Sequence, residues 1–324
     1  MLHTDGALDD RVVAKTAWVL LRFAPERVHA VVDPVHAGRP LRAVCRGLDA
    51  DVPVVADLAA VAAPDRTLVI GTARNGGALA PTQRAAVLEA SAAGMTVLNS
   101  THDAVDAPGV VNMRVFAPSE RRLGVARPRG TTTRVLTVGT TSSVGKMTVT
   151  VLLTRALQAA GHRADWVATG QTGVILRGRG HVLDSVPLDF APGVVEHDIE
   201  VTERDADLVV IEGQGALLHP MWGAASFIFT KVAKPDWLLV CGRMGQERHP
   251  GFDVAIPDVV DVVAAHRTLG EVLGLAPRIL GVALDSTDAD RAAFAAERDR
   301  IEAALGVPCV DPVRDGVDAL VARL

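Results

Sequence analysis

The chain has 324 residues, enough for two domains of about 150 residues each. Apolar residues make up 49% of the sequence and no low-complexity tract interrupts them, so buried cores are easily built. The net charge is −5 with both signs interspersed, tyrosine is absent and aromatic residues are only 3% of the chain. This composition excludes a basic surface or a base-stacking platform, so we expect no nucleic-acid partner.

Apolar stretches such as residues 18–23 and 208–211 are far shorter than the ~20 residues of a membrane span, so no membrane partner is expected. The N-terminus lacks a basic region followed by an apolar block, which is the pattern of a secretory signal. Cys45, Cys241 and Cys309 are far apart and form no zinc-binding pattern. We therefore expect buried thiols and a reduced, cytoplasmic setting.

The first third of the chain alternates short β-branched runs with alanine-rich helical patterns, which is typical of parallel α/β layers. Strands are predicted at residues 28–33, 67–72 and 95–100. A helix is predicted at residues 81–94, where proline occupies the first turn and glycine follows the last. These elements predict a Rossmann-like parallel-sheet domain over residues 1–116.

Residues 117–132 have no sustained periodicity and include four arginines and two prolines. They are predicted to connect two domains, or to fold some of their arginines over a bound anion. A second α/β series then predicts a P-loop NTPase-like domain over residues 133–324. Its strands are expected at residues 133–139, 163–170, 207–213, 237–242 and 278–285, with helices starting at residue 146 and spanning residues 289–306.

The segment VGTTSSVGKMT, residues 138–148, has the strand, glycine loop and helix of a phosphate-binding loop. Amide groups at a helix N-terminus attract anions, the glycines allow close approach, and Lys146 can reach across a diphosphate. The spacing resembles that of the dethiobiotin-synthetase-like branch of P-loop proteins. The residues expected to bind the cofactor are Gly139, Thr140, Ser142, Ser143, Val144, Gly145, Lys146, Met147 and Thr148.

Met147 occupies the position where P-loop NTPases have the serine or threonine that coordinates Mg²⁺. Thr148 does not replace it, because one helical step turns the side chain by ~100°. The loop is therefore predicted to hold a diphosphate well and to organise a metal poorly. This favours binding over phosphoryl transfer.

Polar residues follow two later strands, where a ligand crevice is expected. ATGQTG, residues 168–173, contributes Thr169, Gln171 and Thr172 as candidates for substrate binding, or it is a plain turn. In VVIEGQGALLHP, residues 209–220, Glu212 takes the place of a Walker-B carboxylate and is a candidate for catalysis or for binding Mg²⁺. Gln214 is a further candidate for substrate binding. His219 is either a general base or a structural polar group.

Three weaker signals complete the candidate site. Asp189 and Glu196 belong to a cluster of carboxylates that suits amine recognition or general-base catalysis, although for each residue alone a solvated helix cap is the commoner explanation. DPVHAGR, residues 33–39, and IGTARNGG, residues 70–77, follow strands of the first domain. Their glycines and arginines, Arg74 in particular, suggest a place for a carboxylate.

The motifs at residues 138–148, 168–173, 188–196 and 211–220 follow residues 31–39 and 70–77 in this order. In this combination the chain resembles a family of two-domain P-loop proteins, long of unknown function, whose characterised members are D-glutamate N-acetyltransferases. The resemblance implies acetyl-coenzyme A as donor and an acidic D-amino acid as acceptor. It also implies that Gly139, Gly145, Lys146 and Thr148 hold the phosphates, and that Gln171, Glu212, Gln214 and His219 border the reacting centre.

Three functions therefore remain open from the sequence. The first is an N-acyltransferase that acetylates an acidic, D-glutamate-like amino acid from acetyl-coenzyme A. The second is an ATP-dependent kinase or ligase acting on a small carboxylate or amine, with Mg²⁺ held by Glu212 and Asp189. The third is a nucleotide-sensing switch without catalysis. Apolar helices such as the one expected at residues 257–270 leave surfaces for a homo-oligomer.

Overall fold

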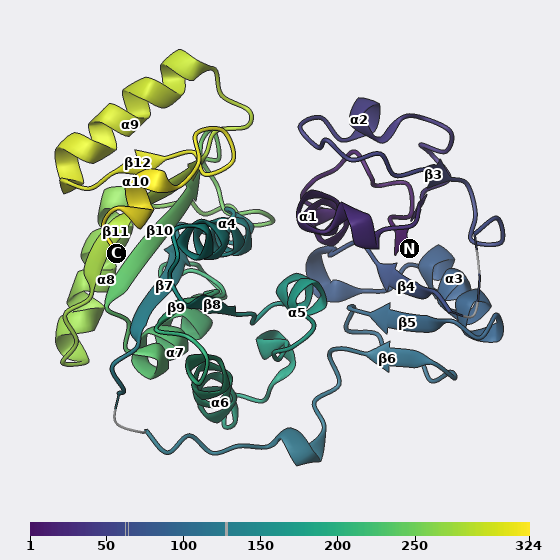
Figure 1. Cartoon of the computed structure of the whole chain (residues 1–324), viewed down its shortest axis with the longest axis horizontal. Helices are drawn as coiled ribbons and strands as arrows, with labels where there is room; N and C mark the ends of the chain where they lie inside the picture. Colours follow the sequence, from purple (N-terminus) through teal and green to yellow (C-terminus); the bar gives the residue numbers. More distant parts are fainter. Residues whose placement is uncertain (62, 64, 127–128) are drawn as a thin grey trace. The chain divides into compact units, whose positions relative to one another are not determined.

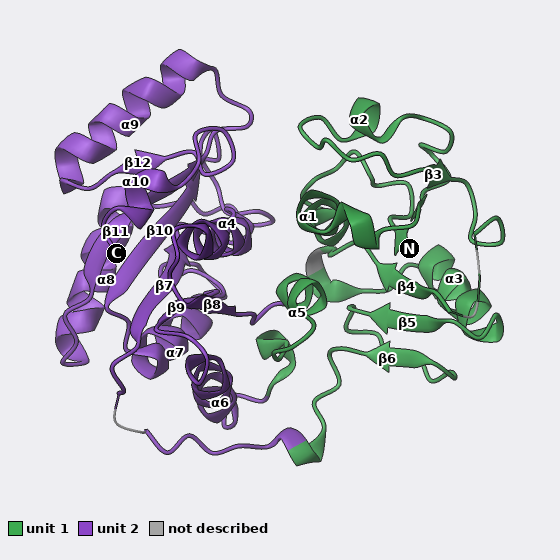
Figure 2. Ribbon diagram, viewed as in Figure 1, with its two compact units in different colours: residues 1–119, 171–186 green, residues 120–170, 187–324 purple. Residues whose placement is uncertain are grey.

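The computed structural model describes residues 1–61, 63, 65–126 and 129–324. The chain folds into two compact units (Figure 2). Unit 1 comprises Met1–Ser119 and Gln171–Val186, and unit 2 comprises Glu120–Gly170 and Pro187–Leu324.

Unit 1 contains a six-stranded, wholly parallel sheet in the order β3-β2-β1-β4-β5-β6 (Figure 1). Its strands are β1 (Leu2–His3), β2 (Val31–Val32), β3 (Val54–Val55), β4 (Thr67–Ile70), β5 (Thr96–Asn99) and β6 (Val110–Asn112). This is the strand order of Rossmann folds. The predicted Rossmann-like parallel sheet is therefore confirmed, with β2, β4 and β5 at the three expected places.

Apolar cores cover both faces of this sheet. On one face Leu2, Val31 and Val69 pack with α1, and on the other Val32, Ile70 and Val97 pack beneath α3. The helices of unit 1 are α1 (Lys15–Phe23), α2 (Leu41–Val44), α3 (Pro81–Ala92) and α5 (Gln171–Arg177), with 3-10 turns at Pro25–Arg27, Asn75–Gly77 and Leu183–Ser185.

Helix α5 and the residues after it, 171–186, belong to unit 1, although the predicted boundaries assign them to the second domain. The physical reason is apolar packing, since Ile175 and Leu176 join the core that contains Leu20 and Leu21 of α1. In the predicted connection at 117–132, residues 127 and 128 lie outside the described part of the chain, and Pro118–Glu120 form a 3-10 turn.

Unit 2 contains a second six-stranded parallel sheet, in the order β12-β11-β10-β7-β9-β8. Its strands are β7 (Thr133–Gly139), β8 (Ala164–Val167), β9 (Leu208–Ile211), β10 (Trp237–Arg243), β11 (Arg278–Asp285) and β12 (Cys309–Val310). Their apolar runs are nearly continuous because a parallel sheet is buried on both faces. The second predicted α/β domain is confirmed.

The helices of unit 2 flank this sheet (Figure 1). They are α4 (Lys146–Ala159), α6 (Ala191–Glu203), α7 (Gly223–Ala233), α8 (Val259–Val272), α9 (Arg291–Leu305) and α10 (Asp318–Val321). Among the described residues, none of the helices combines the length and the hydropathy that crossing a bilayer requires. Strand β7 lies between β9 and β10, so the loop that follows it is flanked by the carboxyl ends of both neighbours.

Candidate functional site

The loop between β7 and α4 has the backbone geometry of an anion cradle. Gly145 has a φ of +87° and Ser143 a φ of +56°, conformations in the left-handed region that turn the chain sharply before α4 begins. A Cβ atom on Gly139 would lie 2.9 Å from Val144 Cγ2 and 3.2 Å from Lys146 Nζ. A larger residue at position 139 would therefore have to displace the Val144 side chain.

Lys146 folds over this loop. Its Nζ donates to the carbonyl oxygen of Thr141 at 2.9 Å, and the residue is only 8% exposed. Thr140 N donates to Cys241 O at 3.0 Å, which ties the loop to the end of β10. The lysine, the loop and the N-terminus of a 14-residue helix thus concentrate positive potential at one place.

Met147 and Thr148 form the first turn of α4, and both are half-buried. Ser142 and Ser143, at the tip of the loop, are also half-buried, whereas Thr140 and Val144 are buried beneath it. The tip and the first helical turn of the loop are therefore partly accessible, while its apolar and threonine side chains face inward.

Glu212, Thr169 and Gln214 form one network at the ends of β8 and β9. Glu212 Oε2 accepts from the backbone N–H groups of Thr169 at 3.0 Å and Gly170 at 3.4 Å. Gln214 Nε2 donates to Glu212 Oε1 at 3.3 Å and to Thr169 Oγ1 at 3.0 Å. The structure thus brings three of the predicted residues together, and the carboxylate braces two adjacent strand ends.

His219 lies in an aromatic cluster that follows β9. Its ring stacks on Trp222 with centroids 4.4 Å apart and meets the edge of Phe252 at 5.4 Å. Its Nδ1 accepts from the backbone N–H groups of Met221 at 3.1 Å and Trp222 at 3.3 Å. Burial, reinforced by the nearby His249 and Lys146, lowers the pKa of His219 to about 4. At neutral pH the imidazole is therefore uncharged.

His249 belongs to the same cluster, although it lies in no recognisable sequence motif. Its Nδ1 lies 2.8 Å from Thr141 Oγ1, and its ring centroid lies 4.5 Å from that of His219. Burial lowers the pKa of His249 as well. Because Thr141 also binds Lys146, the histidine is linked through one loop residue to the lysine of the cradle.

Three of the predicted substrate-binding residues lie in unit 1. Thr172 Oγ1 is 2.7 Å from Thr16 Oγ1 in a buried contact between α5 and α1. Gln171 is buried at the start of α5. Arg74 pairs with Asp5 at 3.3 Å. Thr172 and Arg74 therefore make contacts that hold unit 1 together.

The two weaker carboxylate candidates lie in unit 2. Glu196 Oε2 accepts from Val125 N at 2.8 Å, and a Cβ atom on Gly193 would lie 2.2 Å from Arg122 O. Residues 122–125 therefore run close against α6, and Glu196 holds them there. Asp189 is exposed just before the helix. Within the residues that the structure describes, no group of three or more His, Cys, Asp or Glu is arranged to hold a metal ion.

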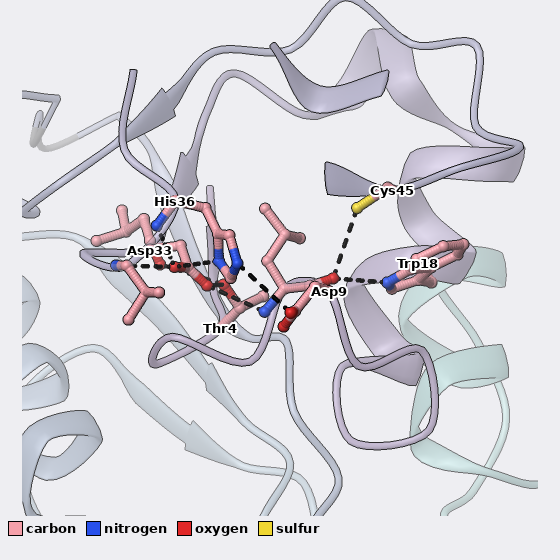
Figure 3. Close-up of polar contacts among 9 residues, drawn as sticks. Thr4, Asp9, Trp18, Asp33, His36 and Cys45 are labelled. Atoms are coloured by element: carbon pink, nitrogen blue, oxygen red, sulfur yellow. Dashed lines mark hydrogen bonds and ion pairs between the residues drawn. The ribbon is translucent and has the colours of Figure 1, made fainter. Parts of the chain in front are cut away.

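Asp33, the first residue of the DPVHAGR motif, lies at the carboxyl end of β2, where Rossmann domains that bind dinucleotides place an acid for the ribose. Here the fully buried carboxylate accepts from Thr4 Oγ1 at 2.6 Å, Leu8 N at 3.1 Å and His36 N at 3.0 Å (Figure 3). Burial raises the pKa of Asp33, but bonds from Thr4, His36 and Leu8 outweigh it and hold the pKa below its usual value. The carboxylate is therefore an internal brace.

The fold and the loop define a two-domain protein with a Rossmann-like unit and a P-loop unit. The chain belongs to the DUF1611 family: the P-loop domain of unknown function DUF1611_C matches residues 122–321, and the Rossmann-like domain DUF1611_N matches residues 34–111. The crystal structure of a DUF1611 family protein from Anabaena variabilis, at 2.30 Å resolution, is 30% identical. It superposes with a TM-score of 0.90 over 99% of this chain and 97% of that one.

Two relatives carry the name of an enzyme. A D-glutamate N-acetyltransferase of Pseudoalteromonas sp. is 29% identical over 273 residues, which are 80% of this chain and 81% of that protein. A D-glutamate N-acetyltransferase of Tritonibacter scottomollicae is 29% identical over 279 residues, or 82% of this chain and 83% of that protein. The predicted family resemblance is confirmed.

Proposed function

We propose that the protein is an N-acyltransferase that moves an acetyl group from acetyl-coenzyme A to the amino group of an acidic D-amino acid such as D-glutamate. The observation that carries the proposal is a phosphate-binding loop in which Met147 replaces the hydroxyl that would organise Mg²⁺. Such a loop suits a ligand whose diphosphate is held and not cleaved. The two relatives named as D-glutamate N-acetyltransferases support this choice of substrates.

The loop and Lys146 fit a diphosphate group. Gly139 leaves room for the close approach of the backbone, and Lys146 Nζ, now on Thr141 O, can exchange that carbonyl for a phosphate oxygen. In the transfer the unprotonated amine attacks the thioester carbonyl, the new C–N bond forms and the C–S bond breaks. The proton lost by the amine leaves with the sulfur, so that one free thiol is released for each amide formed.

Glu212 acts in this scheme as a positioning residue. Its carboxylate already accepts from two backbone N–H groups and from Gln214, contacts that hold the ends of β8 and β9 beside the loop. The competing kinase or ligase reading would instead require Glu212 to serve as a ligand of Mg²⁺. The two functions therefore differ in the product released, free thiol or ADP, and in whether Mg²⁺ is required.

The experiment mixes the purified protein with acetyl-coenzyme A and D-glutamate and follows free thiol with a chromogenic disulfide. Background is low because Cys45, Cys241 and Cys309 are all buried. We expect thiol release that depends on the amino acid, persists in EDTA and is faster with D- than with L-glutamate. Formation of ADP from ATP and Mg²⁺, with no thiol released from acetyl-coenzyme A, would overturn the proposal.

A matched pair of lysine variants tests the cradle itself. Lys146→Met removes the charge over the loop, whereas Lys231→Met removes an exposed charge on α7. A lost hydrogen bond to a charged group costs about 1.5–3 kcal/mol, which corresponds to a ~10- to 100-fold rise in the KM for acetyl-coenzyme A. Lys231→Met should behave like the parent protein. Equal KM values for the two variants would show that the loop does not bind the donor.

A further inference from the structure

Two buried ring nitrogens beside the loop lack a hydrogen-bond partner in the described part of the chain. His219 is 5% exposed and His249 is 1% exposed, and among the described residues neither Nε2 atom has a hydrogen-bond partner. An unpaired buried polar atom is unfavourable, and native proteins keep few of them. The rings lie with centroids 4.5 Å apart next to the phosphate-binding loop, and the unpaired Nε2 of His219 indicates a ligand that pairs with it.

The backbone fixes which nitrogen of His219 bears the proton. Nδ1 accepts hydrogen bonds from Met221 N and Trp222 N, and a nitrogen that accepts cannot carry a hydrogen. In the neutral ring the hydrogen is therefore on Nε2. His219 is thus a hydrogen-bond donor at its unpaired atom, which is the wrong tautomer for a general base acting through Nε2.

The surroundings of His219 determine what this donor can bind. Lys146 is close enough to lower the pKa of the imidazole, after burial and His249, and the N-terminus of α4 adds positive potential. His249 connects the ring to Thr141, whose carbonyl oxygen binds Lys146 Nζ. A ligand that accepts a hydrogen bond in this positive field is an anion. The ammonium group of an amino acid would be repelled.

We propose that His219 is a phosphate-binding residue, whose Nε2–H donates a hydrogen bond to an oxygen of the phosphate or diphosphate held by the loop at residues 139–146. His249 is a positioning residue that holds Thr141, and through it the lysine side of the cradle. The inference shares with the proposed function a phosphate-bearing ligand at the loop. It does not depend on acyl transfer.

Aromatic side chains control access to this donor. Trp222 stacks on His219, with ring centroids 4.4 Å apart, and Phe252 meets both rings edge-on. Because Nε2 of His219 is covered, a phosphate reaches it only when these rings move. Trp222 is 38% exposed and can move without unpacking the core. Its fluorescence should therefore change when an anion binds.

The test measures the affinity of inorganic pyrophosphate for the full chain by calorimetry and by tryptophan fluorescence. His219→Gln keeps an N–H donor near the position of Nε2, His219→Phe keeps the stacking without a donor, and His162→Phe changes an exposed histidine. Because His219→Phe loses one hydrogen bond to an anion, we expect it to bind pyrophosphate at least ~10-fold more weakly than the parent protein. We expect His219→Gln to stay within ~3-fold of the parent protein, and His162→Phe to match it. Binding by His219→Phe that is as tight as in the parent protein would refute the proposal.

A second measurement does not depend on whether these variants fold. The ¹⁵N spectrum of histidine-labelled parent protein distinguishes a ring nitrogen that bears hydrogen from one that does not. We expect His219 to carry its hydrogen on Nε2 between pH 6 and 8, and pyrophosphate to shift that resonance and slow its exchange with water. A hydrogen on Nδ1, or an Nε2 resonance that ignores pyrophosphate, would overturn the assignment. A protein that passes these tests but never releases thiol would refute only the acyl transfer.

Discussion

His266 provides a sharp test of how burial controls charge in unit 2. The residue lies on the buried stripe of α8 with Val259, Val262 and Val263, and it is 0% exposed. Within the described chain, neither ring nitrogen has a hydrogen-bond partner. Burial lowers the pKa of His266 to about 4. A structural histidine of this kind should make the protein sensitive to mild acid.

The size and sign of the effect follow from linkage. An exposed histidine has a pKa of about 6.5, so between pH 6.5 and 4 the unfolded chain binds a proton that the folded chain rejects. The free energy of unfolding therefore decreases as the pH is lowered from 6.5 to 4, by about 3 kcal/mol in total. Above pH 6.5 both states are neutral and the residue adds no pH dependence.

The perturbation is His266→Leu, which removes the titrating ring and its unpaired nitrogens. Its stability relative to the parent protein should improve by about 2–3 kcal/mol between pH 7.5 and pH 4.5. His3, His219 and His249, whose pKa values are also lowered by burial, are present in both proteins and cancel from the comparison. His162→Leu, at an exposed site, should show no such change.

The assay is urea unfolding at several pH values. Because a chain with two compact units need not unfold in one step, it is carried out in a Trp18→Phe background, which confines tryptophan fluorescence to unit 2. If the difference in free energy between His266→Leu and the parent protein stays constant from pH 7.5 to pH 4.5, then burial does not suppress the charge of His266. Burial would then not be expected to suppress the charge of the other buried histidines either.

Three further outcomes are expected. Asp33→Asn should destabilise unit 1 by about 3 kcal/mol at pH 7, because the buried carboxylate accepts several hydrogen bonds. Since the folded pKa of Asp33 is depressed, this loss of stability should shrink as the pH falls below about 4. A loss that stays constant with pH in urea titrations would contradict the prediction. Burial raises the pKa values of Cys45, Cys241 and Cys309 to about 12, so a thiol reagent should label none of them at pH 8 before unfolding, and rapid labelling of Cys241 would contradict its place beneath the loop. Gly213→Ala places a Cβ atom 1.9 Å from Thr137 O and should lower the free energy of unfolding by about 3 kcal/mol or abolish soluble expression. A variant as stable as the parent protein would show that the ends of these strands can accommodate the added methyl group.

Strong local patterns were sufficient for much of the fold. Strand β7 occupies the predicted residues because TRVLTVG is apolar, β-branched and closed by the glycine of the loop. No sequence pattern predicts strand β1, although it lies in the middle of its sheet. It has only two residues, Leu2 and His3, too few for any periodicity to appear. Its position depends on pairing with β2 and β4 far along the chain.

Sequence patterns likewise point to some residues of the candidate site and not to others. Gly139, Gly145 and Lys146 could be identified because a short segment contains the whole signal. His249 could not, since its contact with Thr141 joins residues 108 positions apart and follows no motif. Thr172 shows the opposite difficulty. Its motif suggested a ligand, but its hydroxyl meets Thr16, 156 positions away, and only the fold reveals that contact.

The balance of charge at the site explains two of its features together: Met147 in place of a Mg²⁺-binding hydroxyl, and the uncharged state of the buried histidines. A diphosphate bound without a metal must be stabilised by protein groups alone. Lys146 supplies one positive charge and the N-terminus of α4 about half a charge. A diphosphate diester carries less negative charge than a triphosphate, so these groups come closer to neutralising it. Neutral donors such as His219 add hydrogen bonds without adding a buried charge of their own. Under the proposed function, these charges suit a coenzyme diphosphate better than a nucleoside triphosphate that needs Mg²⁺.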